Sequence, residues 1–238
     1  MEVSPLYQIK VKCTCCEQQF QTSKVRPSFK KSKGSDTDFC VHYKEMNPEY
    51  YVVRVCPFCG FSMTENFSDK MTPRQKSDYY DKLGSKWVSR EFGGERDWAT
   101  AMQSFKLALL CAQIKGERDR ILAGLLHHIA WLYREKSDKE QELRFLQFAL
   151  DAYVRVFQGE EENMNNARLM YLMGELNRRL KKYHEAVRWF GRVINDKKIM
   201  DAAMIRACRE QWVQTREDML ADKLDLPEEL QEEEKKKK

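Results

Sequence analysis

Two pairs of cysteines have the clearest potential for chemistry in this 238-residue sequence. Cys13 and Cys16 form the first pair, Cys56 and Cys59 form the second, and two residues separate the members of each pair. This spacing lets a tight turn aim both sulfurs at one ion, and four thiolates suit the tetrahedral geometry of Zn²⁺. The sequence therefore predicts a four-cysteine zinc site. Iron is the alternative metal, because rubredoxins also use Cys-Pro-x-Cys-Gly turns.

Three further residues could extend this site or replace one of its ligands: Cys15, Cys40 and His42. The gap between the two cysteine pairs is longer than in an ordinary zinc ribbon, which leaves room for a substitute ligand or for a second, poorer site at Cys40 and His42. The simpler interpretation makes Cys40 a small buried residue and His42 a surface histidine. The sequence leaves these alternatives open.

The expected role of the metal is structural. Four cysteines would close the coordination shell of a zinc ion and leave no position for water or substrate. The sequence also lacks the H-E-x-x-H motif of zinc hydrolases. We therefore predict that the protein is not an enzyme. A thiol redox protein centred on Cys15 or Cys40 is a further hypothesis, but it would need a βαβ context that the sequence does not indicate.

The predicted elements place each cysteine pair at the end of a strand. Residues 7–12 alternate apolar and polar side chains, residues 20–25 form a candidate return strand, and residues 51–55 are rich in β-branched side chains. Two such strand ends around one metal resemble a zinc ribbon. Because about 70 residues are too few to fold by apolar burial alone, we expect the metal to hold residues 1–70 together.

Helical patterns replace strand patterns near residue 70. The predicted helices cover residues 73–92, 97–115, 118–136, 138–158, 161–181, 183–195 and 198–222. Two triplets of small and apolar residues share the same spacing: Ala101, Phe105 and Ala108, then Ala186, Phe190 and Val193. This pattern resembles the tetratricopeptide repeat.

The predicted fold class is therefore α+β, with three parts. These are a zinc-ribbon β module in residues 1–70, an all-α, tetratricopeptide-like array of helical hairpins in residues 71–222, and a charged tail in residues 223–238. The boundary near residue 70 also separates most of the cysteines from the helical remainder, where only Cys111 and Cys208 occur. Both of these are expected to be buried and inert.

Charge and hydropathy restrict the partners. The chain begins without a basic segment followed by an apolar one, and its longest apolar run is far too short to span a membrane. We expect a cytoplasmic protein, in which clustered cysteines are metal ligands rather than disulfides. The net charge of +5 is too small to predict nucleic-acid binding by itself. Five basic residues nevertheless lie in the loop 24–33: Lys24, Arg26, Lys30, Lys31 and Lys33.

Several short segments resemble an uncharacterised bacterial family of small cytosolic proteins, known only as a domain of unknown function. They are the first cysteine pair, Asp38-Phe39-Cys40 with Tyr43, Asn47-Pro48 with Tyr50-Tyr51, and Val55-Cys56-Pro57-Phe58-Cys59-Gly60-Phe61 with Phe67. The helical remainder also fits, so the resemblance covers nearly the whole chain. The family has a glycine after its first cysteine pair, where this chain has Glu17. The resemblance implies zinc and a bacterial origin, and it implies no activity or substrate.

Together, these features predict a non-enzymatic adaptor. A zinc-stabilised module would accompany a helical array that offers a groove to a protein or peptide partner, as stacked helical hairpins do. The alternative hypothesis is a nucleic-acid-binding or transcription-associated factor that uses the zinc ribbon and the basic loop 24–33. We expect no contact with a membrane under either hypothesis.

Overall fold

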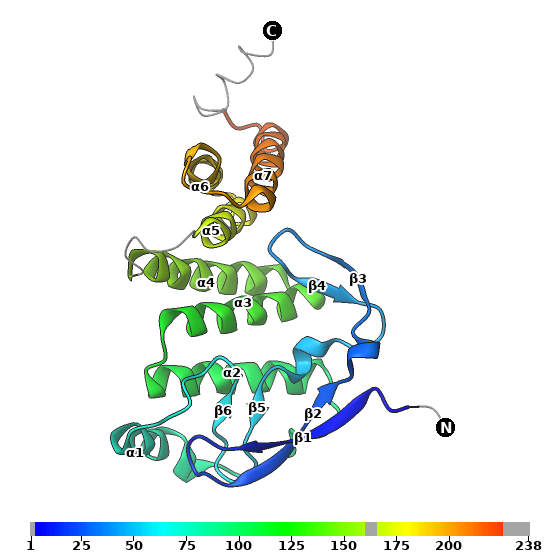
Figure 1. Ribbon diagram of the computed structural model, residues 1–238, viewed down its shortest axis with the longest axis vertical. Helices are drawn as coiled ribbons and strands as arrows, with labels where there is room; N and C mark the ends of the chain where they lie inside the picture. Colours follow the sequence, from blue (N-terminus) through cyan, green and yellow to red (C-terminus); the bar gives the residue numbers. More distant parts are fainter. Residues whose placement is uncertain (1–2, 160–165, 226–238) are drawn as a thin grey trace. The chain divides into compact units, whose positions relative to one another are not determined.

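The computed structural model describes residues 3–159 and 166–225, and it confirms the mixed α+β class (Figure 1). The chain divides into two compact units, Met1–Phe145 and Leu146–Lys238. Short antiparallel strands and most of the cysteines lie in the first unit, and the described part of the second unit is helical. Within the described residues, no helix combines the length and the apolar character that crossing a membrane requires.

Three antiparallel hairpins form the strand part of the first unit. Their strands are β1 (Leu6–Lys12) with β2 (Gln19–Val25), β3 (Ser32–Ser35) with β4 (Val41–Tyr43), and β5 (Arg54–Val55) with β6 (Ser62–Met63). The first cysteine pair lies in the turn between β1 and β2, and the second lies in the turn between β5 and β6. The strands β5 and β6 pack against the helix α2 (Trp98–Lys115), as Figure 1 shows. Each cysteine pair is thus at the tip of a hairpin.

The predicted strand at residues 51–55 is wrong over its first part, because a 3₁₀ turn, η2 (Pro48–Tyr51), precedes a shortened β5. The side chain of Asn47 accepts a hydrogen bond from the backbone N–H of Glu49 at 3.0 Å and caps this turn. Proline suits the first helical position, since it has no N–H to leave unpaired and its φ is already helical. Local capping therefore outweighs the β preference of the residues that follow. Two other 3₁₀ turns are η1 (Pro27–Phe29) and η3 (Gly84–Lys86).

The first helix is also shorter than predicted: α1 spans Pro73–Lys82 and does not reach residue 92. Thr72 begins it with a capping box, as the Thr-Pro sequence indicates. The backbone is extended at Trp87, whose indole N–H donates to the carbonyl of Pro57 at 2.9 Å in the second cysteine turn. This contact joins segments far apart in the sequence. The local signal for the end of the helix is Gly84, directly after the C-cap residue Leu83.

One hydrophobic core joins the strand part of the first unit to its helices. It contains buried side chains from the cysteine turns, from α1, from α2 and from α3 (Asp119–Glu135), among them Phe61, Tyr79, Phe105 and Ile129. The contacts accordingly divide the chain within α4 (Lys139–Gly159), and not at residue 70. That the metal holds residues 1–70 together stays a prediction.

The second unit contains the remainder of α4 and three further helices. These are α5 (Ala167–Arg179), α6 (Tyr183–Asn195) and α7 (Ala202–Ala221). The helix α5 packs on α6, and both pack on α7. A Cβ at Gly174 would lie 2.5 Å from the ring of Phe190, so the glycine lets α5 and α6 approach closely. Residues 161–165 of the predicted fifth helix and residues 226–238 of the predicted tail lie outside the described residues.

The residues of the two predicted triplets are fully buried. Each of the following is 0% exposed: Ala101, Phe105, Ala108, Ala186, Phe190 and Val193. They lie in helices that pair with the next helix along the chain, α2 with α3 and α6 with α7, while α6 also packs on α5. The spacing therefore identified helix-packing positions correctly. The relation of these helices to tetratricopeptide repeats stays a prediction.

Candidate metal centre

The four predicted ligands come together in the first unit. The Sγ atom of Cys13 lies 3.7 Å from that of Cys59, the Sγ atom of Cys16 lies 3.6 Å from that of Cys56, and all four sulfurs lie within 4.8 Å of one another. A tetrahedral site with Zn–S bonds of about 2.3 Å has sulfurs about 3.8 Å apart. The spacing of the four sulfurs therefore fits a tetrahedral metal ion.

The two cysteine turns have the same backbone hydrogen bond, although their sequences differ. In the first turn the N–H of Glu17 donates to the carbonyl of Cys13 at 3.0 Å, and in the second the N–H of Gly60 donates to the carbonyl of Cys56 at 2.8 Å. Glu17 and Gly60 are both left-handed, with φ of 62° and 75°. This conformation costs a residue with a Cβ about 1–2 kcal/mol. The side chain of Glu17 lies 2.7 Å from that of Lys76, a contact that helps to offset this cost.

The thiols of the group interact strongly with one another. A hydrogen bond with Cys56 raises the pKa of Cys13, and the same contact lowers the pKa of Cys56. Hydrogen bonds with Cys13 and Cys15 raise the pKa of Cys59. Thiolates this close together repel one another, so the four thiols cannot all ionise without a cation between them. A divalent ion reverses this balance and stabilises the deprotonated ligands.

Aromatic side chains cover the cysteine turns. The hydroxyl of Tyr79, on α1, donates to the carbonyl of Cys59 at 2.7 Å. The ring of Trp87 lies so close to Gly60 that a Cβ there would be 2.3 Å from it. Cys56 is 0% exposed, and of the four cysteines only Cys16 is partly exposed. The group is therefore a closed site, with its ligands held by packing from outside.

The resemblance to a bacterial family is confirmed by comparison with known proteins. Residues 6–215 match the model of a family described as "Uncharacterized protein conserved in bacteria (DUF2225)". The chain belongs to this family. Both cysteine pairs lie inside the region that the family model matches. No curated protein matches the chain, and no solved structure matches it.

The three residues that the sequence offered as extra or substitute metal ligands lie in two places. Cys15 is buried and a hydrogen bond with Cys59 lowers its pKa, but its sulfur does not belong to the four-sulfur group. Cys40 and His42 lie on the β3–β4 hairpin, where they form a second group with Asp36 whose ligand atoms lie within 4.8 Å of one another. Cys40 is buried, as the simpler interpretation predicted. Neither Cys40 nor His42 takes the place of a cysteine in the first group.

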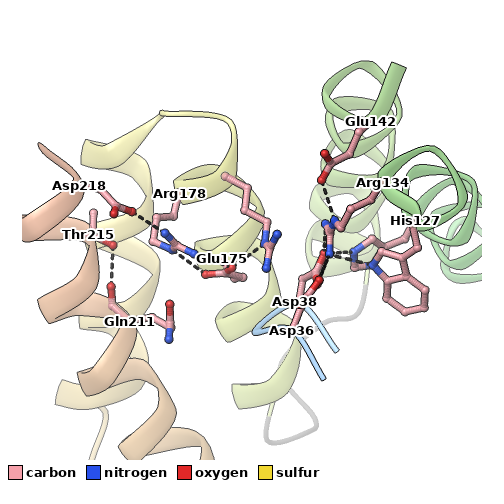
Figure 2. Close-up of polar contacts among 12 residues, drawn as sticks. Asp36, Asp38, His127, Arg134, Glu142, Glu175, Arg178, Gln211, Thr215 and Asp218 are labelled. Atoms are coloured by element: carbon pink, nitrogen blue, oxygen red, sulfur yellow. Dashed lines mark hydrogen bonds and ion pairs between the residues drawn. The ribbon is translucent and has the colours of Figure 1, made fainter. Parts of the chain in front are cut away.

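An ion network that sequence reasoning missed fixes the β3–β4 hairpin to α3 (Figure 2). Asp38 is 0% exposed and accepts two hydrogen bonds from Arg134, at 2.9 and 2.6 Å. Arg134 also lies 2.6 Å from Asp36 and 2.7 Å from Glu142. His127, beside them, is buried, and its burial lowers its pKa, as suits a packing histidine. The only signal in the sequence was the pair of acidic residues two positions apart in the loop of a hairpin.

The predicted basic loop 24–33 is only partly a loop, because it includes the end of β2, the turn η1 and the start of β3, and its basic side chains make several contacts. They are Lys24 to Glu65 at 2.5 Å, Lys31 to Glu45 at 3.8 Å, and Arg26 to the carbonyl of Ser4 at 2.9 Å. Carboxylates beside lysines reduce the positive potential that attracts phosphates. Nucleic-acid binding through this loop stays a prediction, and the geometry does not favour it over protein binding.

Proposed function

We propose that this protein is a non-enzymatic, zinc-stabilised protein-interaction module whose binding groove adjoins a cysteine turn. Cys13, Cys16, Cys56 and Cys59 would hold the ion. Structural zinc contributes on the order of 10 kcal/mol to the folding of small zinc peptides. Isolated two-stranded hairpins are only marginally stable, so a bound ion would supply folding free energy that they lack. Four thiolates close the tetrahedral shell, so the ion stabilises the fold and binds no substrate.

The observation that carries the proposal is a groove in the first unit, of about 390 Å³. It lies between α2 and the segment that follows η3. Apolar, basic and amide side chains line it: Trp87, Val88, Phe92, Leu107 and Leu110, with Lys86, Arg90, Lys106 and Gln103. Val88 is 71% exposed and Leu110 is 46% exposed, so apolar surface in this groove is open to a partner.

Trp87 connects the groove to the metal centre. Its indole N–H donates to the carbonyl of Pro57 at 2.9 Å, and its ring lies against Gly60. Both of these residues belong to the second cysteine turn. The position of one groove residue therefore depends on the turn that the ion holds, and metal removal should impair partner binding as well as folding.

The lining of the groove indicates the chemistry of the partner. Among the residues that the structure describes, those lining the groove include three cations and no carboxylate. An acidic peptide segment with apolar side chains on one face matches this combination. The aromatic and aliphatic contacts would supply most of the affinity, and the three cations would select for negative charge.

Site-specific photo-crosslinking in a bacterial host tests the proposal. A photoreactive amino acid at Leu110 is expected to capture one reproducible protein, and the double change Arg90→Glu and Lys106→Glu is expected to abolish the capture. The matched control places the same photoreactive residue at Val213 of α7, which is also 46% exposed. The proposal fails if Leu110 captures nothing beyond what Val213 captures, or if capture survives the charge reversal.

A further inference from the structure

A second group of metal-ligating side chains lies on the β3–β4 hairpin and shares no residue with the four-cysteine group. Asp36 follows β3, Cys40 precedes β4, and the N–H of Asp36 donates to the carbonyl of Cys40 at 2.8 Å. His42 lies two residues beyond Cys40, and side chains two positions apart in extended chain point to the same face. The hairpin thus brings a carboxylate oxygen, a sulfur and an imidazole nitrogen within 4.8 Å of one another.

We propose that Asp36, Cys40 and His42 bind a second divalent ion of the zinc class, with one coordination position open. Oxygen, sulfur and nitrogen donors are all ligands of Zn²⁺, and three protein ligands leave a fourth position for an exchangeable ligand. Cys40 and His42 both line a cavity of about 310 Å³, so the fourth position has room for water or a small molecule beside it. The site differs in kind from the closed group of four cysteines.

The carboxylate of this group is already held in place from behind. Arg134 lies 2.6 Å from Oδ2 of Asp36, and Figure 2 shows the two side chains together. This contact leaves Oδ1 to face His42, whose Nε2 is 2.8 Å away. Metal-ligating carboxylates and histidines are oriented by such outer contacts, which are part of how a site attains its affinity. The two donors therefore converge on one point before an ion binds.

Carboxylates gather beside the group. Arg134 contacts the carboxylates of Asp36, Asp38 and Glu142, and Lys139 also contacts Glu142. The side chain of Asp36 is 27% exposed, against 0% for Asp38 and 4% for Glu142, so the carboxylate of the proposed site is the most accessible of the three.

Binding exchanges existing contacts for metal bonds. Cys40 loses its thiol proton to solvent and forms a metal–sulfur bond. The Asp36–His42 hydrogen bond gives way to one bond from each residue to the ion, and the imidazole proton then resides on Nδ1, so that Nε2 offers its lone pair. This group has one thiolate where the first group has four. We therefore expect it to bind zinc more weakly than the four cysteines and to release zinc first when a chelator is added.

Equilibrium dialysis of the full chain against Zn²⁺, followed by elemental counting, tests the site. The unaltered protein is expected to hold two ions per chain and His42→Ala one. His184→Ala is the matched control, because it removes an exposed histidine from the second unit and should leave two ions bound. One ion in the unaltered protein, or the same number in His42→Ala as in the unaltered protein, overturns the proposal.

Cobalt provides a readout that does not depend on counting. Co²⁺ added to protein preloaded with one equivalent of Zn²⁺ is expected to give a thiolate-to-cobalt absorption band. Cys40→Ser should abolish this band, and His42→Ala should weaken Co²⁺ binding by about tenfold or more, since even the loss of an outer contact costs that much. Unchanged far-UV circular dichroism confirms that each variant is folded. A band that persists in Cys40→Ser places the ion elsewhere and overturns the assignment.

Discussion

The two units both bury a carboxylate completely, yet they differ in the metal-ligating side chains that they bring together. Asp38 in the first unit and Glu175 in the second are 0% exposed, and arginine side chains pair with each of them (Figure 2). The first unit also contains two groups of metal-ligating side chains, whereas the described part of the second contains none. Two-stranded hairpins are marginal by themselves, while helices packed on helices form a core without help. We therefore expect a bound metal to add to the core of the first unit, where the strands are short, and we expect the second unit to rely on helix packing alone.

Removal of the structural metal is the largest effect we predict, and it should act on the first unit alone. Chelation, or Cys56→Ser with Cys59→Ser, removes a contribution on the order of 10 kcal/mol, which is as large as the whole stability of a typical domain. Because the cysteine turns share a core with α2 and α3, these two helices should lose amide protection together with the strands. Hydrogen exchange should leave α5 and α6 protected.

Cys208→Ala provides the matched control for this experiment. Cys208 is buried in the second unit and belongs to neither ligand group, so its replacement should leave the chelator response of α2 unchanged. Protection of α2 that survives chelation would mean that the apolar core of the first unit suffices, and the proposed difference between the units would be wrong. Loss of protection confined to residues 1–70 would support the boundary that composition predicts.

Removing one partner from each of the two ion networks should destabilise the two units by different amounts, because the charged group left without its partner differs in burial. Arg134→Ala leaves Asp38 fully buried without its guanidinium, which should cost about 3–5 kcal/mol of unfolding free energy. Glu175→Ala leaves Arg178 its contact with Asp218, and the side chains of Arg178 and Arg179 are already 15% and 18% exposed. We therefore expect a smaller loss of about 1–3 kcal/mol. Urea denaturation measures both.

Arg134→Lys is the informative control for the first of these changes. Lysine keeps the charge but cannot donate to both oxygens of Asp38 in the forked geometry of arginine. We expect Arg134→Lys to recover part of the stability and not all of it. Equal losses for Arg134→Ala and Glu175→Ala would contradict the argument from burial.

Helix bounds could be predicted from the sequence wherever a helix is capped by its own neighbours. The predicted helix 97–115 agrees with α2, whose caps are Asp97 and Gly116, with Gly116 at φ 71°. The prediction failed at α1, where Trp87 leaves the helical pattern to contact Pro57. Trp87 and Pro57 are 30 residues apart, so the helical periodicity around Trp87 carries no information about their contact.

The residues of the candidate sites also divide into those that a local pattern predicts and those that it does not. Two residues between cysteines is a local signal, and it sufficed to identify Cys13, Cys16, Cys56 and Cys59 as a group. The pairing of Asp36 with Arg134 spans 98 residues and follows only from how the hairpin lies against α3. Sequence reasoning could therefore name ligands in regular motifs, but not the arginine that orients a carboxylate from a distant helix.

Glycine-to-alanine changes at three positions test how closely the chain packs beside the cysteine turns and away from them. A Cβ at Gly60 would lie 2.3 Å from the Trp87 ring, and one at Gly174 would lie 2.5 Å from the Phe190 ring. Gly60→Ala and Gly174→Ala should each cost about 1–3 kcal/mol of unfolding free energy through overpacking. In the control Gly124→Ala, the new methyl group meets no atom within 4 Å and should stabilise α3 by up to about 1 kcal/mol.

Thermal denaturation with and without zinc distinguishes the two crowded positions. Gly60→Ala should lower the midpoint and also weaken zinc binding, because Gly60 is left-handed and lies directly after a ligand. Gly174→Ala should lower the stability of the second unit and leave zinc affinity unchanged. A change in zinc affinity in Gly174→Ala would contradict the separation of the two units.

The smallest effects that we predict come from helix caps, and they test the same comparison through kinetics. Thr72 accepts a hydrogen bond from the N–H of Gln75 at 3.2 Å at the start of α1, and Asp201 accepts one from the N–H of Met204 at 3.0 Å at the start of α7. Thr72→Ala and Asp201→Ala should each cost about 1 kcal/mol of helix stability. Each change removes one side-chain hydrogen bond to a backbone N–H in the first turn of a helix.

Only one of these two caps belongs to a helix that covers the cysteines. The helix α1 carries Tyr79, whose hydroxyl donates to the carbonyl of Cys59, so a looser α1 should open the ligand turn more often. A difference of about 1 kcal/mol corresponds to about fivefold, and Thr72→Ala should speed zinc release to a chromophoric chelator by up to that factor. Asp201→Ala should leave the rate unchanged. If both variants release zinc faster by the same factor, the two units open as one cooperative body, and the metal stabilises the second unit as much as the first.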